Sequence, residues 1–153
     1  MIDFTDIKSK GFSGVMFRCT DGIDIVEESY TESRNESIKH GVHWGAYHVL
    51  RPGDVADQVH VFLNKSIRKV ADKTKFPQCG VHFTDPRNGF WQAVYFLELL
   101  GQTSDNHGFL YIDRELKNRV MEINDRARKY PLIILDSDKI DTVAQKWYFV
   151  RPV

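Results

Sequence analysis

Polar and aromatic side chains cluster where a β-rich stretch of the sequence ends, within residues 41–53, which read GVHWGAYHVLRPG. Tyr47, His48 and Arg51 stand at this end, directly before a Pro-Gly pair. Barrel proteins place their functional side chains at strand ends and in the loops that follow. Aromatic faces suit the stacking of sugar rings, and a charged neighbour can hold hydroxyl groups or a carboxylate. The alternative is that Tyr47 and His48 fill the interior and rim of a barrel, and the sequence favours the two roles equally.

Three aspartates and one histidine near other predicted strand ends could also carry chemistry. Asp21 could orient a ligand or accept backbone hydrogen bonds in a turn, and its place before a glycine favours the turn. Asp136 and Asp138 form a close carboxylate pair after the predicted strand 132–135, although the run DSDK favours a solvated loop. His82 stands alone in an apolar strand, where the role of a displaced acid–base group competes with the more common role of a hydrogen-bonded core residue.

Several segments in the first half of the chain resemble the glycoside hydrolase family 25 lysozymes, which cut peptidoglycan between N-acetylmuramic acid and N-acetylglucosamine. In that family an "IDW"-like opening leads into a strand that ends in "KATEG", and the next strand reads "GAYHF" before "RP". Here the same order appears as residues 2–4 (IDF), 19–22 (CTDG), 45–49 (GAYHV) and 51–52 (RP). The resemblance covers residues 2 to about 65. It implies a (β/α) barrel with a glycan groove, and the candidate glycan-binding residues are Tyr47, His48, Arg51, Asp21 and His82.

The resemblance also implies that the catalytic carboxylates of the family are missing. Family members carry one Asp in a first strand that precedes the "IDW" element, and Met1 directly precedes Ile2 here. A later family strand ends in an Asp-x-Glu pair, and it corresponds to residues 79–85, CGVHFTD. Depending on the register, the residues at its two carboxylate positions are His82 and Thr84, or Val81 and Phe83. Because glycoside hydrolysis normally needs two carboxyl groups, we expect a domain that has lost hydrolysis.

Asp85 is the nearest carboxylate to the missing pair. It could sit at the barrel mouth and support acid–base chemistry together with a histidine. Residues 85–89, DPRNG, favour instead an Asx-type turn in which Asp85 caps the next helix. The alternative of an active N-acetylmuramidase requires Asp85 or the pair Asp136 and Asp138 to take over, or a first strand supplied by another chain.

Composition narrows the class of protein. The 153 residues predict one domain, and 21 basic against 21 acidic residues leave no net charge to hold nucleic acid. No apolar run reaches the roughly 20 residues of a membrane helix, and no secretion signal is recognisable, so we expect a phage virion or the host cytoplasm as the location.

Cys19 and Cys79 lie in predicted buried strands, where a free thiol is favoured over a disulfide. We find no phosphate loop or metal-ligand spacing and expect no cofactor.

Short apolar strands alternate with helical patterns, which predicts an α/β fold with a mainly parallel sheet or barrel. Strands are expected near residues 14–19, 43–49, 80–83, 108–112, 132–135 and 146–150. Helices are expected over residues 54–72, 86–100 and 113–129, with a surface loop at 101–108. This is about six of the family's eight strands, so we expect an open barrel edge that another segment, another copy or a partner protein must cover.

The sequence as a whole therefore predicts a lysozyme-like barrel that binds peptidoglycan or another glycan, or serves as a structural part, in a phage or prophage particle. An active N-acetylmuramidase is the first alternative. The second is an assembly protein without glycan contact, which predicts a buried Tyr47 and self-association through sheet edges. Three tryptophans could form a glycan platform, although core packing is favoured for at least two of Trp44, Trp91 and Trp147.

Overall fold

The structure is a computed structural model that describes residues 2–12, 14–66, 78–104, 108–120, 127–135 and 147–151. The strands are β1 (Gly14–Asp21), β2 (Ile25–Val26), β3 (His43–Leu50), β4 (Gln78–Phe83), β5 (Phe109–Asp113), β6 (Leu132–Leu135) and β7 (Trp147–Phe149). The helices are α1 (Phe4–Ser9), α2 (Tyr30–Lys39), α3 (Val55–Ser66), α4 (Phe90–Ser104), α5 (Arg114–Val120) and the 3-10 turn Ala127–Lys129. Within the described ranges, no helix is long and apolar enough to cross a membrane.

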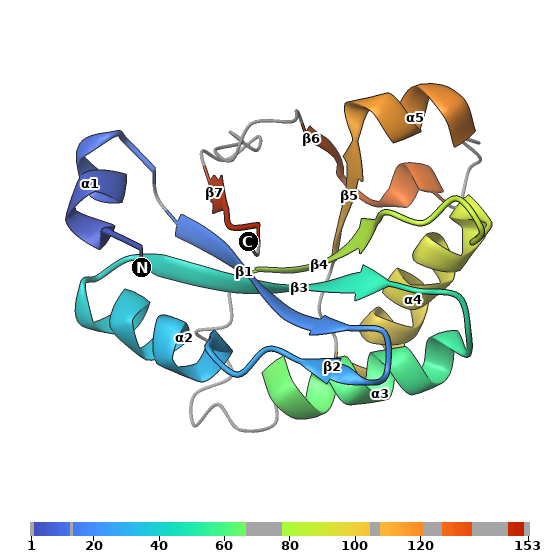
Figure 1. Cartoon of the computed structure of the whole chain (residues 1–153), viewed down its shortest axis with the longest axis horizontal. Helices are drawn as coiled ribbons and strands as arrows, with labels where there is room; N and C mark the ends of the chain where they lie inside the picture. Colours follow the sequence, from blue (N-terminus) through green and yellow to red (C-terminus); the bar gives the residue numbers. More distant parts are fainter. Residues whose placement is uncertain are drawn as a thin grey trace.

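The strands form one curled, mostly parallel sheet (Figure 1). Strands β1, β3, β4, β5 and β6 lie side by side in chain order, and each neighbouring pair is parallel. Helices α2, α3 and α4 pack on one face of the sheet, as expected when helices connect parallel strands. Strand β1 reads GVMFRCTD and is almost wholly buried, which is typical of a strand covered on both faces. The predicted α/β fold with an open barrel is confirmed.

The edge of β1 that faces away from β3 is covered by the same chain. Strand β7 pairs in parallel with Gly14–Met16, and β2 pairs antiparallel with Thr20–Asp21. The sequence left three ways to cover an open barrel edge: another segment of the chain, another copy or a partner protein. At β1, two segments of the chain itself cover the edge. This edge therefore needs no second copy or partner protein to cover those two stretches.

The helix predictions are right in place but not in length. The helix expected over 86–100 is α4, which begins at Phe90 because Asp85 starts a separate turn: the Asn88 N–H donates to the Asp85 carbonyl at 3.0 Å. It continues to Ser104, so the loop expected at 101–108 is wrong over its first half. Gly101 lies inside this helix, but one glycine costs a helix only about 1 kcal/mol. The burial of Leu97 and Leu100 outweighs that cost.

Two other predicted helices lie partly outside the described residues. Of the helix expected over 113–129, the structure describes an α-helix over Arg114–Val120 and a 3-10 turn over residues 127–129. The helix expected over 54–72 is α3, which the structure describes from Val55 to Ser66.

Side chains alternate between two apolar layers along each strand. The outer layer lies under the helices and includes Val15, Phe17 and Cys19 of β1. The inner layer fills the concave side of the sheet with Met16, Tyr47, Val49, Tyr111, Ile133, Leu135 and Phe149. Cys19 and Cys79 are buried and free, and burial raises the pKa of the Cys79 thiol to about 12.

Candidate functional site

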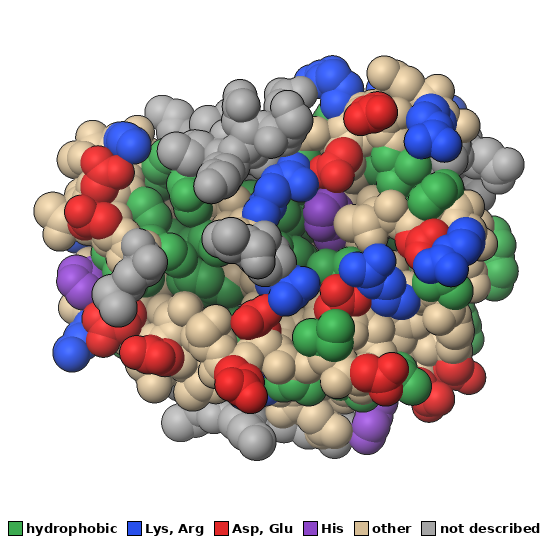
Figure 2. All heavy atoms as spheres, in the orientation of Figure 1, with side chains coloured by type: hydrophobic (Ala, Val, Ile, Leu, Met, Phe, Trp, Pro, Cys, Tyr) green, Lys and Arg blue, Asp and Glu red, His purple; other side chains and the backbone are tan. Residues whose placement is uncertain are grey.

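Two adjoining hollows lie over the carboxyl ends of the parallel strands. The larger has a volume of about 490 Å³ and is lined by Arg18, Asp21, Tyr47, Val49, Arg51, His82, Thr84, Asp85, Pro86 and Arg151. The smaller, of about 400 Å³, is lined by residues 21–25, 51–54 and Gln58. Asp21 and Arg51 line both, so the two hollows form one cleft, which we call the strand-end cleft. Acidic and basic side chains lie next to one another around it (Figure 2).

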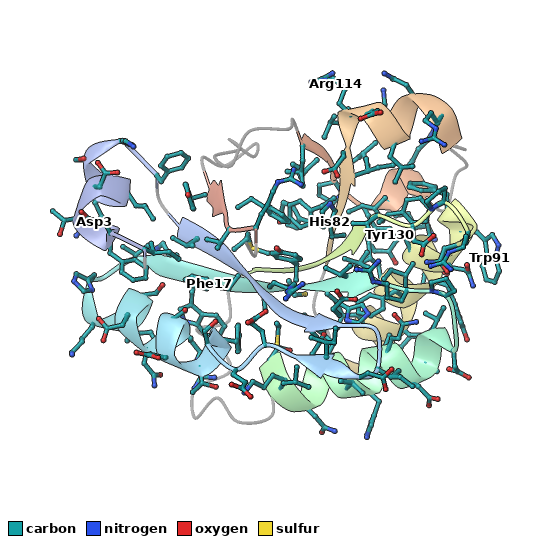
Figure 3. The ribbon with its side chains drawn as sticks, viewed as in Figure 1. Asp3, Phe17, His82, Trp91, Arg114 and Tyr130 are labelled. Carbon is teal, nitrogen blue, oxygen red and sulfur yellow. The ribbon has the colours of Figure 1, made fainter. Side chains whose placement is uncertain are left out.

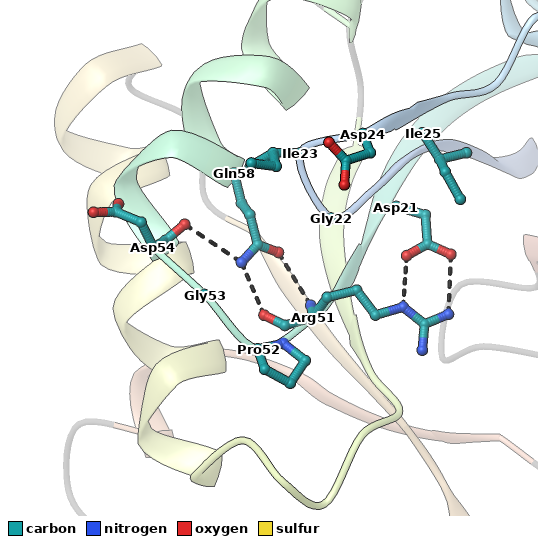
Figure 4. Close-up of a pocket in the computed structure, with 10 residues that line it drawn as sticks. All are labelled: Asp21, Gly22, Ile23, Asp24, Ile25, Arg51, Pro52, Gly53, Asp54 and Gln58. Carbon is teal, nitrogen blue, oxygen red and sulfur yellow. Dashed lines mark hydrogen bonds and ion pairs between the residues drawn. The ribbon is translucent and has the colours of Figure 1, made fainter.

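An ion pair between Asp21 and Arg51 stands in the middle of the cleft (Figure 4). The Arg51 Nε and Nη2 atoms donate to the two oxygens of Asp21 at 2.6 and 3.0 Å, and Arg18 Nη1 lies 3.4 Å from Asp21 Oδ2. Only 5% of Asp21 is exposed. The carboxylate was predicted to accept backbone hydrogen bonds in a turn, but its contacts are arginine side chains. Such bidentate contacts fix the position and orientation of a carboxylate.

The loop after β3 is held in place by Gln58 of α3. Gln58 Nε2 donates to the Arg51 carbonyl at 2.9 Å, while Gln58 Oε1 accepts from the Arg51 N–H at 3.1 Å. Opposite this loop, Gly22 has a φ of 62°, and a Cβ there would lie 3.3 Å from Arg51 Cγ. Glycine at position 22 therefore allows the close approach of the two loops that brings Arg51 to Asp21.

Asp85 follows β4 and forms the turn that the sequence favoured. Its Oδ1 accepts the Arg87 backbone N–H at 2.9 Å, and the Arg87 guanidinium donates to both carboxylate oxygens, with Nη2 to Oδ2 at 2.6 Å. The hydrogen bonds from the Arg87 side chain and backbone lower the pKa of Asp85 to about 2. Asp85 lines the cleft as a fixed anion, and a group with so low a pKa is a poor proton donor near neutral pH.

The end of β4 carries His82 and Thr84, and neither is a carboxylate. His82 Nε2 lies 3.3 Å from Asp113 Oδ1, which also accepts from Arg151 Nη2 at 3.0 Å. Burial opposes ionisation of Asp113, but the contacts with His82 and Arg151 outweigh it, so the pKa of Asp113 is lowered. The hydroxyl of Thr84 is buried without a hydrogen-bond partner among the described residues. His82 thus has a hydrogen-bond partner at the rim, which is the role the sequence favoured.

Tyr47 forms the floor of the cleft from β3. Its ring stacks on Phe149 with 4.2 Å between ring centroids, and its hydroxyl donates to the Val150 carbonyl at 2.6 Å. Only 1% of Tyr47 is exposed, and this burial raises the pKa of its hydroxyl. Tyr47 therefore lines the cleft but exposes almost none of its surface, and this burial is what the alternative of an assembly protein without glycan contact predicts.

His48 does not reach the cleft, and its assignment as a glycan-binding residue is corrected here. Neighbouring residues of a strand point to opposite faces, so His48 points into the outer layer when Tyr47 points into the cleft. It is fully buried between Thr20 Oγ1, at 2.6 Å from Nδ1, and Gln58 Oε1, at 2.8 Å from Nε2, and it stacks on Phe96. Burial lowers the pKa of His48 to about 4.

The structure brings Tyr47, Arg51, Asp21, His82 and Asp85 together in one cleft. Arg18, Asp113 and Arg151 belong to the same charged group and were missed by sequence reasoning. Asp113 could have been found, because it directly follows a predicted strand, where functional side chains are expected. The sequence pattern favours it instead as the first residue of a helix. Asp136 and Asp138 lie outside the described residues. Within the described ranges, no three His, Cys, Asp or Glu side chains come together as metal ligands.

A curled parallel sheet with outer helices and a cleft at the strand ends is the architecture of a (β/α)-barrel protein. The chain belongs to the glycosyl hydrolases family 25, whose family model matches residues 1–79. This confirms the resemblance seen in the sequence. No curated protein sequence matches the chain.

Solved structures of similar fold cover almost the whole chain. A family GH25 lysozyme from Aspergillus fumigatus is 19% identical with a TM-score of 0.74, and the match covers 96% of this chain and 78% of that one. A muramidase from Acremonium alcalophilum is 15% identical with a TM-score of 0.72, covering 97% and 81%. The CTP1L endolysin is 16% identical with a TM-score of 0.71, covering 100% and 57%. At these identities the likeness shows a shared fold.

Proposed function

We propose that this chain is a lysozyme-like domain that binds peptidoglycan through the strand-end cleft and does not hydrolyse it. One observation carries the proposal: both carboxylates that line the larger hollow, Asp21 and Asp85, are in close ion pairs with arginine side chains. The cleft thus has polar groups to recognise a ligand while its carboxylates are already engaged. The names of the similar structures, lysozyme and muramidase, support peptidoglycan as the ligand.

The chemistry of glycoside hydrolysis explains why these ion pairs argue against catalysis. One carboxyl group must be protonated near neutral pH to assist the leaving group, which requires a raised pKa, while a second acts as a nucleophile or base. In the described part of the chain, the two carboxyl groups with a shifted pKa are Asp85 and Asp113, and both pKa values are lowered. At the end of β4, the side chains that line the cleft are His82 and Thr84, which are one of the two residue pairs that could occupy the family's Asp-x-Glu positions, and neither is a carboxylate.

The same groups are well suited to hold a sugar chain. The larger hollow is lined by the guanidinium groups of Arg18, Arg51 and Arg151, each paired with a carboxylate, and the Thr84 hydroxyl lacks a partner among the described residues. Sugar hydroxyl groups both donate and accept hydrogen bonds, so a cleft with donors and carboxylate acceptors side by side complements them. A volume of about 490 Å³ lies within the usual range of a small-ligand site.

Binding can be tested by co-sedimentation with purified peptidoglycan. The wild-type protein is expected to co-sediment in a saturable manner. The variant Thr84→Phe places a large side chain in the cleft and is expected to weaken binding at least tenfold. The matched control Thr5→Phe makes the same change on the exposed surface of α1 and should leave binding unchanged. Thermal unfolding of each variant checks that it folds.

Two results would contradict this proposal. Wild-type protein that stays in the supernatant at every peptidoglycan concentration would favour an assembly protein without glycan contact. Equal binding by Thr84→Phe and wild type would show that the cleft is not the binding site. As the setting of this activity we propose a phage or prophage particle, and the similarity of fold to an endolysin supports that choice.

A further inference from the structure

We infer that Trp91 and Tyr95 form a second sugar-binding surface outside the cleft, which stacks against the apolar face of pyranose rings. The choice of ligand rests on the proposed peptidoglycan binding. Trp91 is 53% exposed and Tyr95 is 36% exposed. They lie four residues apart on α4, so they share one face of the helix. Their ring centroids are 6.4 Å apart with an angle of 38° between the rings.

The indole ring of Trp91 is held in place by the turn that precedes α4. A Cβ at Gly89 would lie 2.6 Å from both Nε1 and Cδ1 of Trp91, so the ring lies directly against the bare backbone of Gly89. The Gly89 N–H donates to Gln92 Oε1 at 2.9 Å, which fixes the same turn. One edge of the indole therefore contacts the protein while more than half of the side chain faces solvent. A fixed aromatic ring loses little entropy when a ligand stacks on it.

The size of this surface favours a sugar over a protein partner. A stable protein interface covers about 800 Å² on each partner, which two aromatic side chains cannot supply. The other exposed large hydrophobic residues in the described ranges lie elsewhere, on the segment 23–26 and on α2. Two exposed rings with centroids 6.4 Å apart offer apolar faces on which a short stretch of glycan can stack. Trp44, by contrast, is 2% exposed and packs in the core, and the side chain of Trp147 lies outside the described residues.

The position of the pair connects it with the cleft. Asp85 and Pro86 line the cleft, and the turn that they begin leads directly into the first turn of α4, where Trp91 stands. In Figure 3, Trp91 extends outward at the edge of the molecule, well apart from His82. Residues 85–89 thus join the cleft to the helix that carries the indole ring. This arrangement lengthens the footprint on a polymeric ligand without enlarging the cleft.

The test uses a soluble probe, an N-acetylglucosamine tetramer, and nuclear magnetic resonance of the tryptophan side chains. The variant Trp91→Phe identifies the indole N–H signal of Trp91 by its loss. We expect this signal to shift in a saturable manner with the tetramer, both in wild type and in Thr84→Phe. In co-sedimentation with peptidoglycan, Trp91→Ala should bind at least threefold more weakly than wild type, whereas Trp91→Phe should keep most of the affinity. The control Ile38→Ala removes an equally exposed apolar side chain from α2 and should have no effect.

The outcomes separate this inference from the proposed function. An unchanged Trp91 signal, in a protein that still co-sediments and still loses binding with Thr84→Phe, overturns the inference and leaves the cleft proposal intact. A Trp91 signal that moves with protein concentration in the absence of sugar also overturns it, because the surface would then be a contact between copies. A shift of the Trp91 signal with the tetramer that persists in Thr84→Phe supports a separate surface, whether or not the cleft binds peptidoglycan.

Discussion

Replacing Phe149 with alanine is expected to lower the free energy of unfolding by about 3–5 kcal/mol, the usual cost of removing a buried phenylalanine. Phe149 is fully buried on the concave side of the sheet. Its ring lies 4.2 Å from that of Tyr47 and 4.8 Å from that of Tyr111, measured between centroids. Among the described residues, strand β7 pairs with β1 through three residue pairs, so we expect the side chain of Phe149 to provide much of its attachment.

Urea unfolding followed by far-ultraviolet circular dichroism measures this loss. The matched control is Phe12→Ala, which removes a ring that is only partly buried beside Tyr148. We expect the control to lose much less stability than Phe149→Ala. A loss below about 1 kcal/mol for Phe149→Ala, within the range of surface substitutions, would show that β7 is not held by this contact. The same variant should also weaken glycan binding, because Tyr47 would lose the ring that supports it.

The folded protein is expected to lose about 2 kcal/mol of stability between pH 7 and pH 5 through His48 alone. Burial lowers the pKa of His48 from 6.5 to about 4 and outweighs the hydrogen bond with Gln58 and the charge of Asp21, which act in the opposite direction; the charge of Arg51 has the smallest effect and acts in the same direction as burial. Below pH 6.5 the unfolded chain binds a proton at this histidine while the folded chain does not, so the equilibrium shifts toward unfolding. The loss of stability grows until the pH approaches 4, where the folded protein also binds the proton. Each unit of difference between the two pKa values corresponds to about 1.4 kcal/mol.

The variant His48→Gln tests this dependence. It removes the titrating group, so its stability should change much less than that of wild type between pH 7 and pH 5, even if it is less stable at pH 7. The matched control His40→Gln makes the same substitution at a half-exposed histidine on the surface. Asp85, with its pKa lowered to about 2, contributes only below its ordinary pKa of 3.8, outside this interval. Parallel curves for wild type and His48→Gln would contradict the assignment.

Much of the fold could be predicted from the sequence because the strand signals are local. The apolar runs near residues 14–19 and 43–49 form β1 and β3. The motif GAYHV indicated the family and also put Tyr47 near the end of a strand. The facing direction of His48 was not predicted, because a run that is buried on both faces has no polar alternation to show which side chains point inward. Once Tyr47 points to the cleft, however, the period of two in a strand requires His48 to point away.

The partners of the carboxylates could not be predicted. Arg51 meets Asp21 across 30 residues and Arg151 meets Asp113 across 38 residues, and such pairs depend on the register of neighbouring strands. Arg87 is the exception, because it lies two residues from Asp85 in a turn that the sequence indicated. Gly89 and Trp91 are likewise two residues apart in the sequence, but only the structure shows that the indole remains exposed.

The release of reducing ends from purified peptidoglycan measures directly whether the cleft cuts the polymer that we propose it binds. Wild type should be compared with Asp21→Asn, Asp85→Asn and the double variant Asp136→Asn/Asp138→Asn, beside an active lysozyme as positive control. The account predicts no release by wild type above a heat-denatured sample, at protein concentrations that saturate binding. Release by wild type that is abolished in one of the variants would contradict the account and would identify that carboxylate as catalytic.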